Sequence, residues 1–257
     1  MISIEPLQDY ALRRLLRSRP FYRRYPYTHP VNIQAADRHG AIDRAHRFFY
    51  NRIPKCANST VIQTLAAYRS GTENPGAVRA AKRAFTKPMA MRKRDMAAFE
   101  QDYFKFTFVR NPYTRILSAY LDKMVHRGYA RRRRYRVLLD ERLPADESPS
   151  LDRFLDYLED GGLYANVHWA PQTALWLIPR TAFDFIGRLE SLDADLPHVL
   201  QRIFPDATES GPEKIVRAGP PATGAKDKVR SMLTPRQIDR VSALYRQDIK
   251  ELGYDFM

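Results

Sequence analysis

A strand-like segment that runs through a short lysine loop into a helix constrains the fold of this chain most. Residues 46–53 are rich in aromatic and β-favouring side chains and are typical of a buried strand. Pro54 cannot donate to a ladder of strand hydrogen bonds, so we expect the strand to end there. Apolar residues recur at helical spacing after residue 60, which predicts a helix beginning near Asn58 or Ser59.

This arrangement predicts an anion site in the loop. The first N–H groups of a helix lack partners within the helix and carry the positive end of its dipole. Ser59 and Thr60 add hydroxyl donors, and Lys55 adds a mobile ammonium. The loop is not a Walker A motif, because its lysine comes first and it contains no glycine. A plain strand–helix turn with an exposed lysine is the alternative interpretation.

A second strand and helix follow the same order. Residues 104–109 alternate apolar and polar side chains, which predicts a strand whose three phenylalanines face the core. Asn111 is a favoured N-cap and Pro112 a favoured first helical residue. Arg110 ends the strand, and Ser118 lies off the apolar stripe of the helix, so the two could bind one phosphate. A surface arginine and a solvent-facing serine are the alternative.

Taken together, these two motifs resemble the sulfotransferases that use 3′-phosphoadenosine 5′-phosphosulfate (PAPS), particularly the carbohydrate branch, sulfotransferase family 2. Residues 53–60 are similar to the 5′-phosphosulfate loop of that family, and residues 106–120 to its 3′-phosphate motif. Residues 166–172, 183–190 and 244–254 are similar to further blocks of the branch. The resemblance covers residues 46–257, which leaves residues 1–45 as an N-terminal extension to a sulfotransferase domain.

The resemblance implies a fold and a set of binding residues. The fold is a single α/β domain with a central parallel sheet flanked by helices, similar to the P-loop nucleotide kinases. Lys55 binds the bridging oxygen or the sulfonate, and Arg110 and Ser118 bind the 3′-phosphate. A late basic loop covers the cofactor, with Lys226 and Lys228 as candidates. The residues that hold the 5′-phosphosulfate are Lys55, Cys56, Ala57, Asn58, Ser59 and Thr60.

The implied activity is transfer of a sulfuryl group from PAPS to a hydroxyl, of a carbohydrate or glycoconjugate, without a metal. The acceptor needs a general base, and His168 is the candidate because it lies in a block that matches the family. A structural histidine beside Trp169 is the alternative. Carboxylates between the two motifs are further options for the base: Asp95, Glu100 and Asp102.

The chain also carries a strong positive charge. Its formal net charge is +14, which favours an anionic partner. The basic segment 127–136 could contact an acidic glycan or an anionic membrane surface, or could be a solvated loop. One cysteine, Cys56, excludes an intramolecular disulfide framework; without a spanning segment or a secretory signal, we expect a cytoplasmic location.

Two alternative functions stay open, and the rest of the sequence predicts further helices and strands. A nucleotide-dependent P-loop-like kinase and, less favoured, a non-enzymatic protein that binds polyanions or nucleic acid are the alternative functions. Residues 205–233 are expected to form a long irregular basic segment. Further strands are expected at 174–178 and 183–186, and further helices at 151–160, 190–203 and 235–251.

Overall fold

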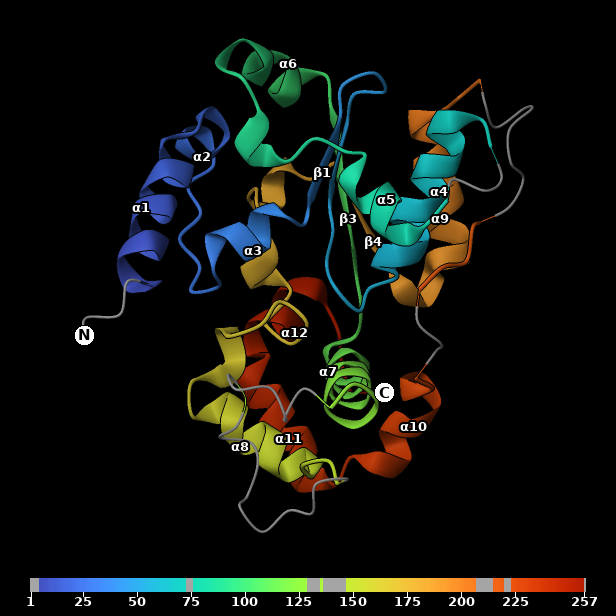
Figure 1. Ribbon diagram of the computed structural model, residues 1–257. Helices are drawn as coiled ribbons and strands as arrows, with labels where there is room; N and C mark the ends of the chain where they lie inside the picture. Colours follow the sequence, from blue (N-terminus) through green and yellow to red (C-terminus); the bar gives the residue numbers. More distant parts are fainter. Residues whose placement is uncertain are drawn as a thin grey trace. The chain divides into compact units, whose positions relative to one another are not determined.

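The computed structural model places most of the chain (Figure 1). It describes residues 5–72, 76–128, 135, 147–206, 215–219 and 223–256. The chain divides into two compact units, each described by itself. The first unit comprises Met1–Val109 and Leu175–Gly219, and the second unit comprises Arg110–Ala174 and Pro220–Met257. Among the described residues, no helix has the length and apolar character needed to cross a membrane.

The first unit is built on a four-stranded sheet. Its strands lie in the order β1 (Gly40–Asp43), β2 (Phe48–Asn51), β3 (Phe104–Val109) and β4 (Phe185–Arg188). The α/β class is confirmed, and β2, β3 and β4 are parallel. The predicted parallel sheet is thus confirmed for these three strands, but the sheet as a whole is mixed, because β1 pairs antiparallel with β2. A link as short as the one between β1 and β2 permits only an antiparallel pair.

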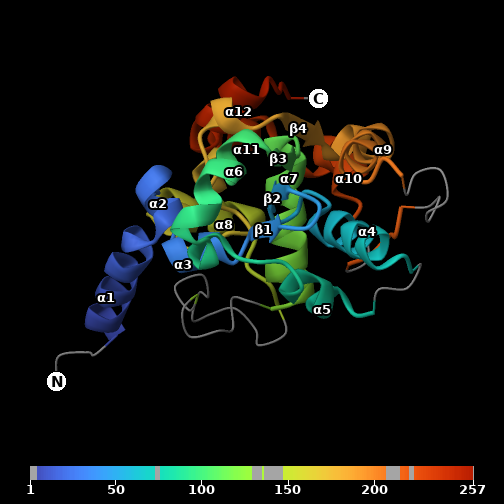
Figure 2. The ribbon, with the colours of Figure 1, turned by 90° about the horizontal axis from the view of Figure 1, so that it is seen from above.

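Helices cover both faces of this sheet. One face carries α4 (Asn58–Ser70), α5 (Val78–Arg83) and α9 (Leu192–Ile203) (Figure 1). Seen from above, the other helices of the unit lie on the opposite side of the strands (Figure 2). These are α1 (Glu5–Ser18), α2 (Pro20–Arg24), α3 (Ile33–Asp37) and α6 (Met96–Gln101). The helices on both faces shield the sheet, which therefore accepts apolar side chains in both directions.

Aromatic side chains form the centre of the first unit. Phe48, Tyr50, Phe106 and Phe108 are inaccessible to solvent. The rings of Tyr50 and Phe106, which are register partners on β2 and β3, stack with centroids 4.9 Å apart. Contact between aromatic rings adds to the free energy gained from burial. The three phenylalanines of β3 thus face the α4, α5 and α9 side, as the alternation predicts.

The expected strand at 174–178 is wrong. Its start belongs to a single 3₁₀ turn, Thr173–Leu175, and the rest is irregular although it is buried. Asn51 supplies the hydrogen bonds that a strand partner would otherwise give: its side chain donates to Leu175 O at 3.2 Å and accepts from Leu177 N at 2.7 Å. The other 3₁₀ turns of the first unit are Pro88–Ala90, Lys93–Asp95, Arg180–Ala182 and Leu189–Ser191.

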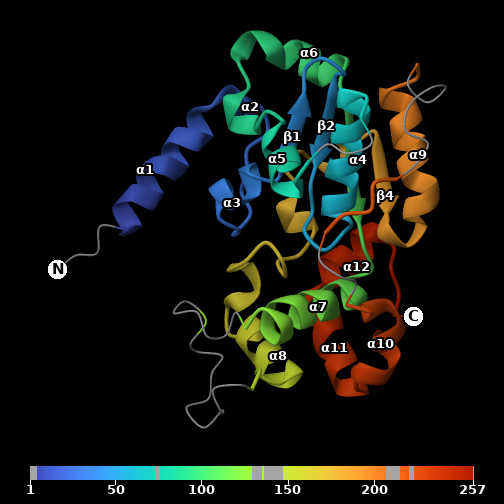
Figure 3. The ribbon, with the colours of Figure 1, turned by 45° about the vertical axis from the view of Figure 1, so that its right-hand side comes forward.

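The second unit is helical. Helix α7 (Pro112–Tyr120) is buried along its whole length and continues as a π-helix, Leu121–His126. The remaining elements are α8 (Leu151–Glu159), the 3₁₀ turn Gly162–Tyr164, α10 (Ala225–Met232), α11 (Pro235–Leu244) and α12 (Arg246–Leu252). Figure 3 shows α10 and α11 beside α7, and α11 also packs against α8. Trp169, fully buried, packs with Tyr135 and Phe154 in the core of this unit.

Two predictions for the C-terminal part need correction, one of an irregular segment and one of a helix. The irregular segment expected at 205–233 is wrong over Ala225–Met232, which forms α10. The helix expected at 235–251 is two helices, because Tyr245 leaves the helical conformation between α11 and α12. The arginine run 131–134, Pro220 and Pro221 lie outside the described residues.

Candidate functional site

The lysine loop joins β2 to α4 through an unusual backbone path. Lys55 (φ 71°) and Ala57 (φ 53°) both adopt the left-handed conformation, which is uncommon for residues other than glycine. Such strained positions cluster at binding and catalytic sites. Helix α4 begins at Asn58, as predicted, and its N-cap residue Ala57 has no side chain that could accept from the first turn. This helix end therefore retains the character of an anion site.

Cys56 lies inside the loop but is not exposed. Its side chain is fully buried, and its Sγ lies 3.8 Å from Pro54 O. A buried thiol behaves as a small apolar group. Its side chain therefore packs inside the loop, and a contact of Cys56 with the 5′-phosphosulfate stays a prediction.

The first turn of α4 contacts a lysine that the sequence did not point to. Lys82 of α5 donates from Nζ to Ser59 Oγ at 3.1 Å. Ser59 itself belongs to the predicted phosphate-binding set. The contact therefore brings a second ammonium to the helix end at which Lys55 was expected to act alone.

Thr60 is engaged differently from its neighbour. Its Oγ1 donates to Ala218 O at 3.1 Å and accepts from Ala218 N at 3.3 Å. Thr64, one turn later, accepts from Val216 N at 3.0 Å. The two threonines thus hold the segment 215–219 along α4, and the Thr60 hydroxyl serves that segment in this structure. A phosphate contact by Thr60 stays a prediction.

Arg110, predicted to bind the 3′-phosphate, belongs to the second unit. Its backbone exchanges two hydrogen bonds with the side chain of Gln172, each 2.8 Å long. Its guanidinium donates from Nε to Thr114 Oγ1 at 2.9 Å, one turn further along α7. Asn111 accepts from Tyr113 N at 3.0 Å, which confirms it as the N-cap, with Pro112 in the first turn. These contacts fix the direction of the arginine side chain.

Ser118 is buried, so the alternative of a solvent-facing serine is wrong. It is 3% exposed, and its Oγ lies 3.2 Å from the hydroxyl of Thr223. Thr223 directly precedes Gly224, the N-cap of α10. The start of α10 therefore lies at Ser118. Of the two lysines predicted there, Lys228 is exposed, and only the backbone of Lys226 is described.

His168 sits in a hydrogen-bond network with Asn166. Its Nδ1 lies 2.7 Å from Asn166 Oδ1, and that oxygen also accepts from His168 N at 3.0 Å. Asn166 in turn donates to Tyr135 OH at 2.6 Å. Because an amide oxygen only accepts, Nδ1 must be the protonated nitrogen, and the neutral ring carries its lone pair on Nε2. That tautomer suits a general base, a role that stays a prediction for His168.

The other candidates for the base are all paired with arginines. Asp95 lies 3.2 Å from Arg44, and Asp102 lies 3.3 Å from Arg47. Glu100 forms an ion pair with Arg24. These contacts give each carboxylate a structural role.

Comparison with known proteins decides the family. The sequence model described as the sulfotransferase family matches residues 38–255, most of the chain. The chain belongs to the sulfotransferase family. No solved structure gives a significant match to it.

The chain is also similar to several curated carbohydrate sulfotransferases. It is 31% identical to carbohydrate sulfotransferase 14 of Mus musculus over 210 residues, which cover 77% of this chain and 55% of the relative. It is 32% identical to the Homo sapiens protein of the same name, over 73% of this chain and 53% of the relative. It is 27% identical to carbohydrate sulfotransferase 10 of Gallus gallus, over 59% and 47%. The chain thus spans about half the length of these relatives.

Asp248 of α12 joins two segments that are far apart in the sequence, residues 244–254 and residues 166–173. This fully buried carboxylate accepts from Gln172 N at 2.7 Å, Thr173 N at 2.9 Å and Thr173 Oγ1 at 2.8 Å. Gln172 is the residue that grips the backbone of Arg110. Through Gln172, Asp248 of α12 therefore supports the backbone of Arg110, which is predicted to bind the 3′-phosphate. The sequence placed Asp248 in a matching block but gave no sign of this role.

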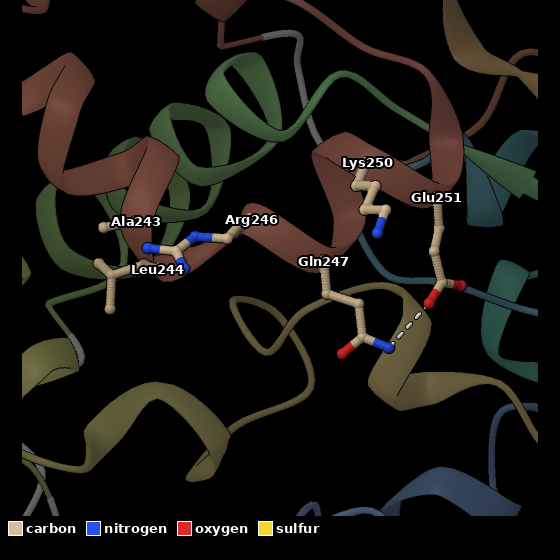
Figure 4. A pocket seen from close by; sticks show the side chains of 6 residues that line it. All are labelled: Ala243, Leu244, Arg246, Gln247, Lys250 and Glu251. Carbon is tan, nitrogen blue, oxygen red and sulfur yellow. Dashed lines mark hydrogen bonds between the residues drawn. The ribbon is translucent and has the colours of Figure 1, made fainter.

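An open pocket lies elsewhere, on α11 and α12 (Figure 4). Its volume is about 610 Å³, and its lining residues are Ala243, Leu244, Arg246, Gln247, Lys250 and Glu251. Gln247 donates to Glu251 at 2.9 Å across one helical turn. The lining carries charges of both signs, and none of its residues belongs to the predicted site.

Proposed function

We propose that this sulfotransferase transfers a sulfuryl group from PAPS to a hydroxyl of a carbohydrate. The observation that carries the proposal is the order of two polar residues in a chain that belongs to the family: Arg110 directly before α7, held by Thr114, and buried Ser118 two turns later on α7, at the start of α10. A 3′-phosphate is the group that separates PAPS from ATP. A fork of guanidinium donors with a nearby hydroxyl suits such a phosphate.

The lysine loop would take the other end of the donor. The 5′-phosphosulfate is anionic, and the uncapped start of α4 with Lys55 and Ser59 offers the donors it needs. The loop would act as a P-loop-like cradle without glycine, because Lys55 and Ala57 already adopt the conformation that glycine usually supplies. Its chemistry is therefore compatible with the donor.

The reaction is an in-line displacement at sulfur. The acceptor oxygen forms a bond to sulfur while the bond from sulfur to the bridging oxygen breaks, and adenosine 3′,5′-bisphosphate leaves. Negative charge builds on the leaving and equatorial oxygens, so positioned cations provide most of the catalysis. Lys55 would neutralise the leaving oxygen, and Nε2 of His168 would take the hydroxyl proton. The names of the relatives, which are carbohydrate sulfotransferases, support a carbohydrate as acceptor.

Calorimetric titration with adenosine 3′,5′-bisphosphate and with ATP tests the donor site. We expect micromolar affinity for the bisphosphate and weaker binding of ATP. Arg110→Ala should lower the bisphosphate affinity at least tenfold, because a charge-assisted hydrogen bond contributes about 1.5–3 kcal/mol. Arg180→Ala, an exposed arginine in the first unit, is the matched control. Preference for ATP, as expected of a kinase, or indifference to Arg110→Ala would disprove the proposal.

Turnover with labelled PAPS tests the chemistry. His168→Ala should leave the bisphosphate affinity unchanged and reduce turnover at least a hundredfold, since general bases contribute about 10²–10⁴-fold. The same assay, run over a panel of neutral and acidic saccharides, identifies the acceptor. Turnover close to that of the unmodified protein would remove His168 as the base.

A further inference from the structure

A buried arginine in the first unit lacks one hydrogen-bond partner. Arg52 lies between β2 and the lysine loop and is only 4% exposed. It donates to the carbonyl oxygens of His39 and Arg38 through Nε and Nη2. Among the described residues, nothing accepts from its Nη1, which is also buried. A buried charged donor without an acceptor is costly, and such a site is unusual in a folded protein.

A lysine lies beside this arginine. Lys87 donates from Nζ to Gly40 O at 3.2 Å and to Lys82 O at 2.9 Å. His39 and Gly40 are consecutive, so Arg52 and Lys87 donate to successive carbonyl oxygens at the start of β1. Burial, and then the charge of Arg52, lower the pKa of Lys87 to about 8. The two cations therefore repel each other in a poorly solvated place.

The surroundings do little to offset this positive charge. The charge of Asp37 raises the pKa of Lys87, which partly offsets the effect of Arg52. One oxygen of this carboxylate already accepts from Tyr22 OH and Met89 N, each at 2.8 Å, and burial raises the pKa of Asp37 itself. Burial lowers the pKa of His39 to about 3, so its ring is neutral. The hydroxyl of Tyr50 is buried, has no partner among the described residues, and has a raised pKa.

The same group of residues reaches the lysine loop. The carbonyl of Lys82 accepts from Lys87, and the ammonium of Lys82 donates to Ser59 in the first turn of α4. Lys82 thus lies between Lys87 and the first turn of α4. An oxyanion bound here would give Arg52 Nη1 an acceptor and would reduce the repulsion between Arg52 and Lys87.

We propose that Arg52 and Lys87 form a second oxyanion subsite, adjoining the lysine loop, for a sulfate, phosphate or carboxylate group. The subsite deepens the proposed function, since the oxyanion comes either from the sulfuryl end of the donor or from an acidic group of the saccharide acceptor. Its contacts are separate from those of Arg110 and Ser118. Its failure therefore does not affect the bisphosphate titration.

Competitive acetylation of Lys87, read by mass spectrometry, tests the subsite in the full chain. An amine reacts only when neutral, so a bound anion that raises the pKa slows the reaction about tenfold for each pKa unit. At pH 7.5 and constant ionic strength, millimolar sodium sulfate should slow acetylation of Lys87 at least fivefold relative to sodium chloride. Lys93, exposed in the same unit, should react equally fast in both salts.

Two further arms identify the source of the oxyanion. Slowing by PAPS but not by glucuronate or galactose 6-sulfate assigns the subsite to the donor, and the opposite result assigns it to the acceptor. Lys87→Met should lower the calorimetric affinity for sulfate at least tenfold, whereas Lys93→Met should not change it. An acetylation rate of Lys87 that neither sulfate, PAPS nor the acidic sugars alter would overturn the proposal.

Discussion

Single buried polar side chains hold several irregular segments of this protein. Asn51 binds the backbone on both sides of Trp176, and Asp248 binds the backbone at Gln172 and Thr173. Arg115, which is 1% exposed, donates to Ala170 O at 2.8 Å and Val167 O at 3.2 Å. Buried backbone groups outside helices and strands need such partners. Arg115 and Asp248 therefore support residues 167–173, which include His168 and the glutamine that binds the backbone of Arg110.

Replacing Asp248 should destabilise the protein strongly. Asp248→Ala leaves two buried backbone N–H groups without an acceptor, and each such loss costs about 1–3 kcal/mol. We expect the free energy of unfolding in urea to fall by at least about 2 kcal/mol, with a smaller loss for Asp248→Asn. Asp239→Ala, an exposed change on α11, is the control. Equal unfolding midpoints for Asp248→Ala and its control would contradict this role.

His39 should make the stability depend on pH. Its folded pKa of about 3 lies below the usual 6.5, so between these values the unfolded chain binds more protons. Stability is therefore fully present above pH 6.5 and falls as the pH drops towards 3, by at most about 1.4 kcal/mol per pH unit.

Urea unfolding at pH 7.5, 6 and 5 measures this dependence. His39→Gln should weaken it, because glutamine does not titrate, whereas His126→Gln on the exposed surface should leave it unchanged. Identical pH profiles for His39→Gln and the unmodified protein would rule the explanation out.

At the scale of elements, N-cap residues and apolar alternation in the sequence predicted the helix starts and strands that depend on local residues alone. The start of α7 follows from Asn111 and Pro112, and the range of β3 follows from its alternation. Helix α10 has only a sparse signal in its polar sequence; its described side chains include buried Ala225 and Val229, and buried Leu233 follows its end. Its helical state depends on packing against α7. Packing also divides the last helix, where buried Tyr245 donates to Trp169 O at 2.6 Å.

The candidate site divides in the same way. Lys55, Arg110 and Ser118 stand in short motifs, so their positions could be read from the sequence. The partners that the structure adds come from far along the chain: Lys82 is 23 residues from Ser59, and Thr223 is 105 residues from Ser118. No local pattern records such a contact, because only the folded chain brings these residues together.

Helices α8 and α11 are joined by one arginine. Arg240 of α11 donates to three carboxylates of α8, Asp152, Asp156 and Glu159. Because those carboxylates are largely exposed, solvent screens the pairs and each contributes about 1 kcal/mol or less.

Arg240→Ala should therefore lower the melting temperature by a few degrees in low salt. The difference should shrink in 0.5 M NaCl, since salt screens exposed charges. Arg236→Ala removes an exposed charge from the same helix and serves as the control. A loss that is as large in high salt as in low salt would show that packing, not charge, is responsible.

At the scale of the whole molecule, the charge of +14 should govern the encounter with a polyanion. Fluorescence anisotropy with labelled dextran sulfate measures this, with neutral dextran as the matched control. We expect affinity for dextran sulfate to fall more than tenfold between 50 and 300 mM NaCl, because salt screens the attraction. Binding that is insensitive to salt, or equal for both polymers, would argue against a charge-driven contact.

The division of the chain into two units has a consequence for its synthesis. Each unit combines an early stretch with a late one, so neither is complete when the first half of the chain has left the ribosome. Strand β3 can pair with β4 only after β4 is synthesised, and β4 begins 76 residues after β3 ends. The backbone of Gln172 likewise lacks its acceptor until Asp248, 76 residues later, is synthesised. During that interval the nascent chain exposes aromatic strands that later become interior, a state prone to aggregation. A chaperone that covers these strands during the interval should therefore raise the yield of folded protein.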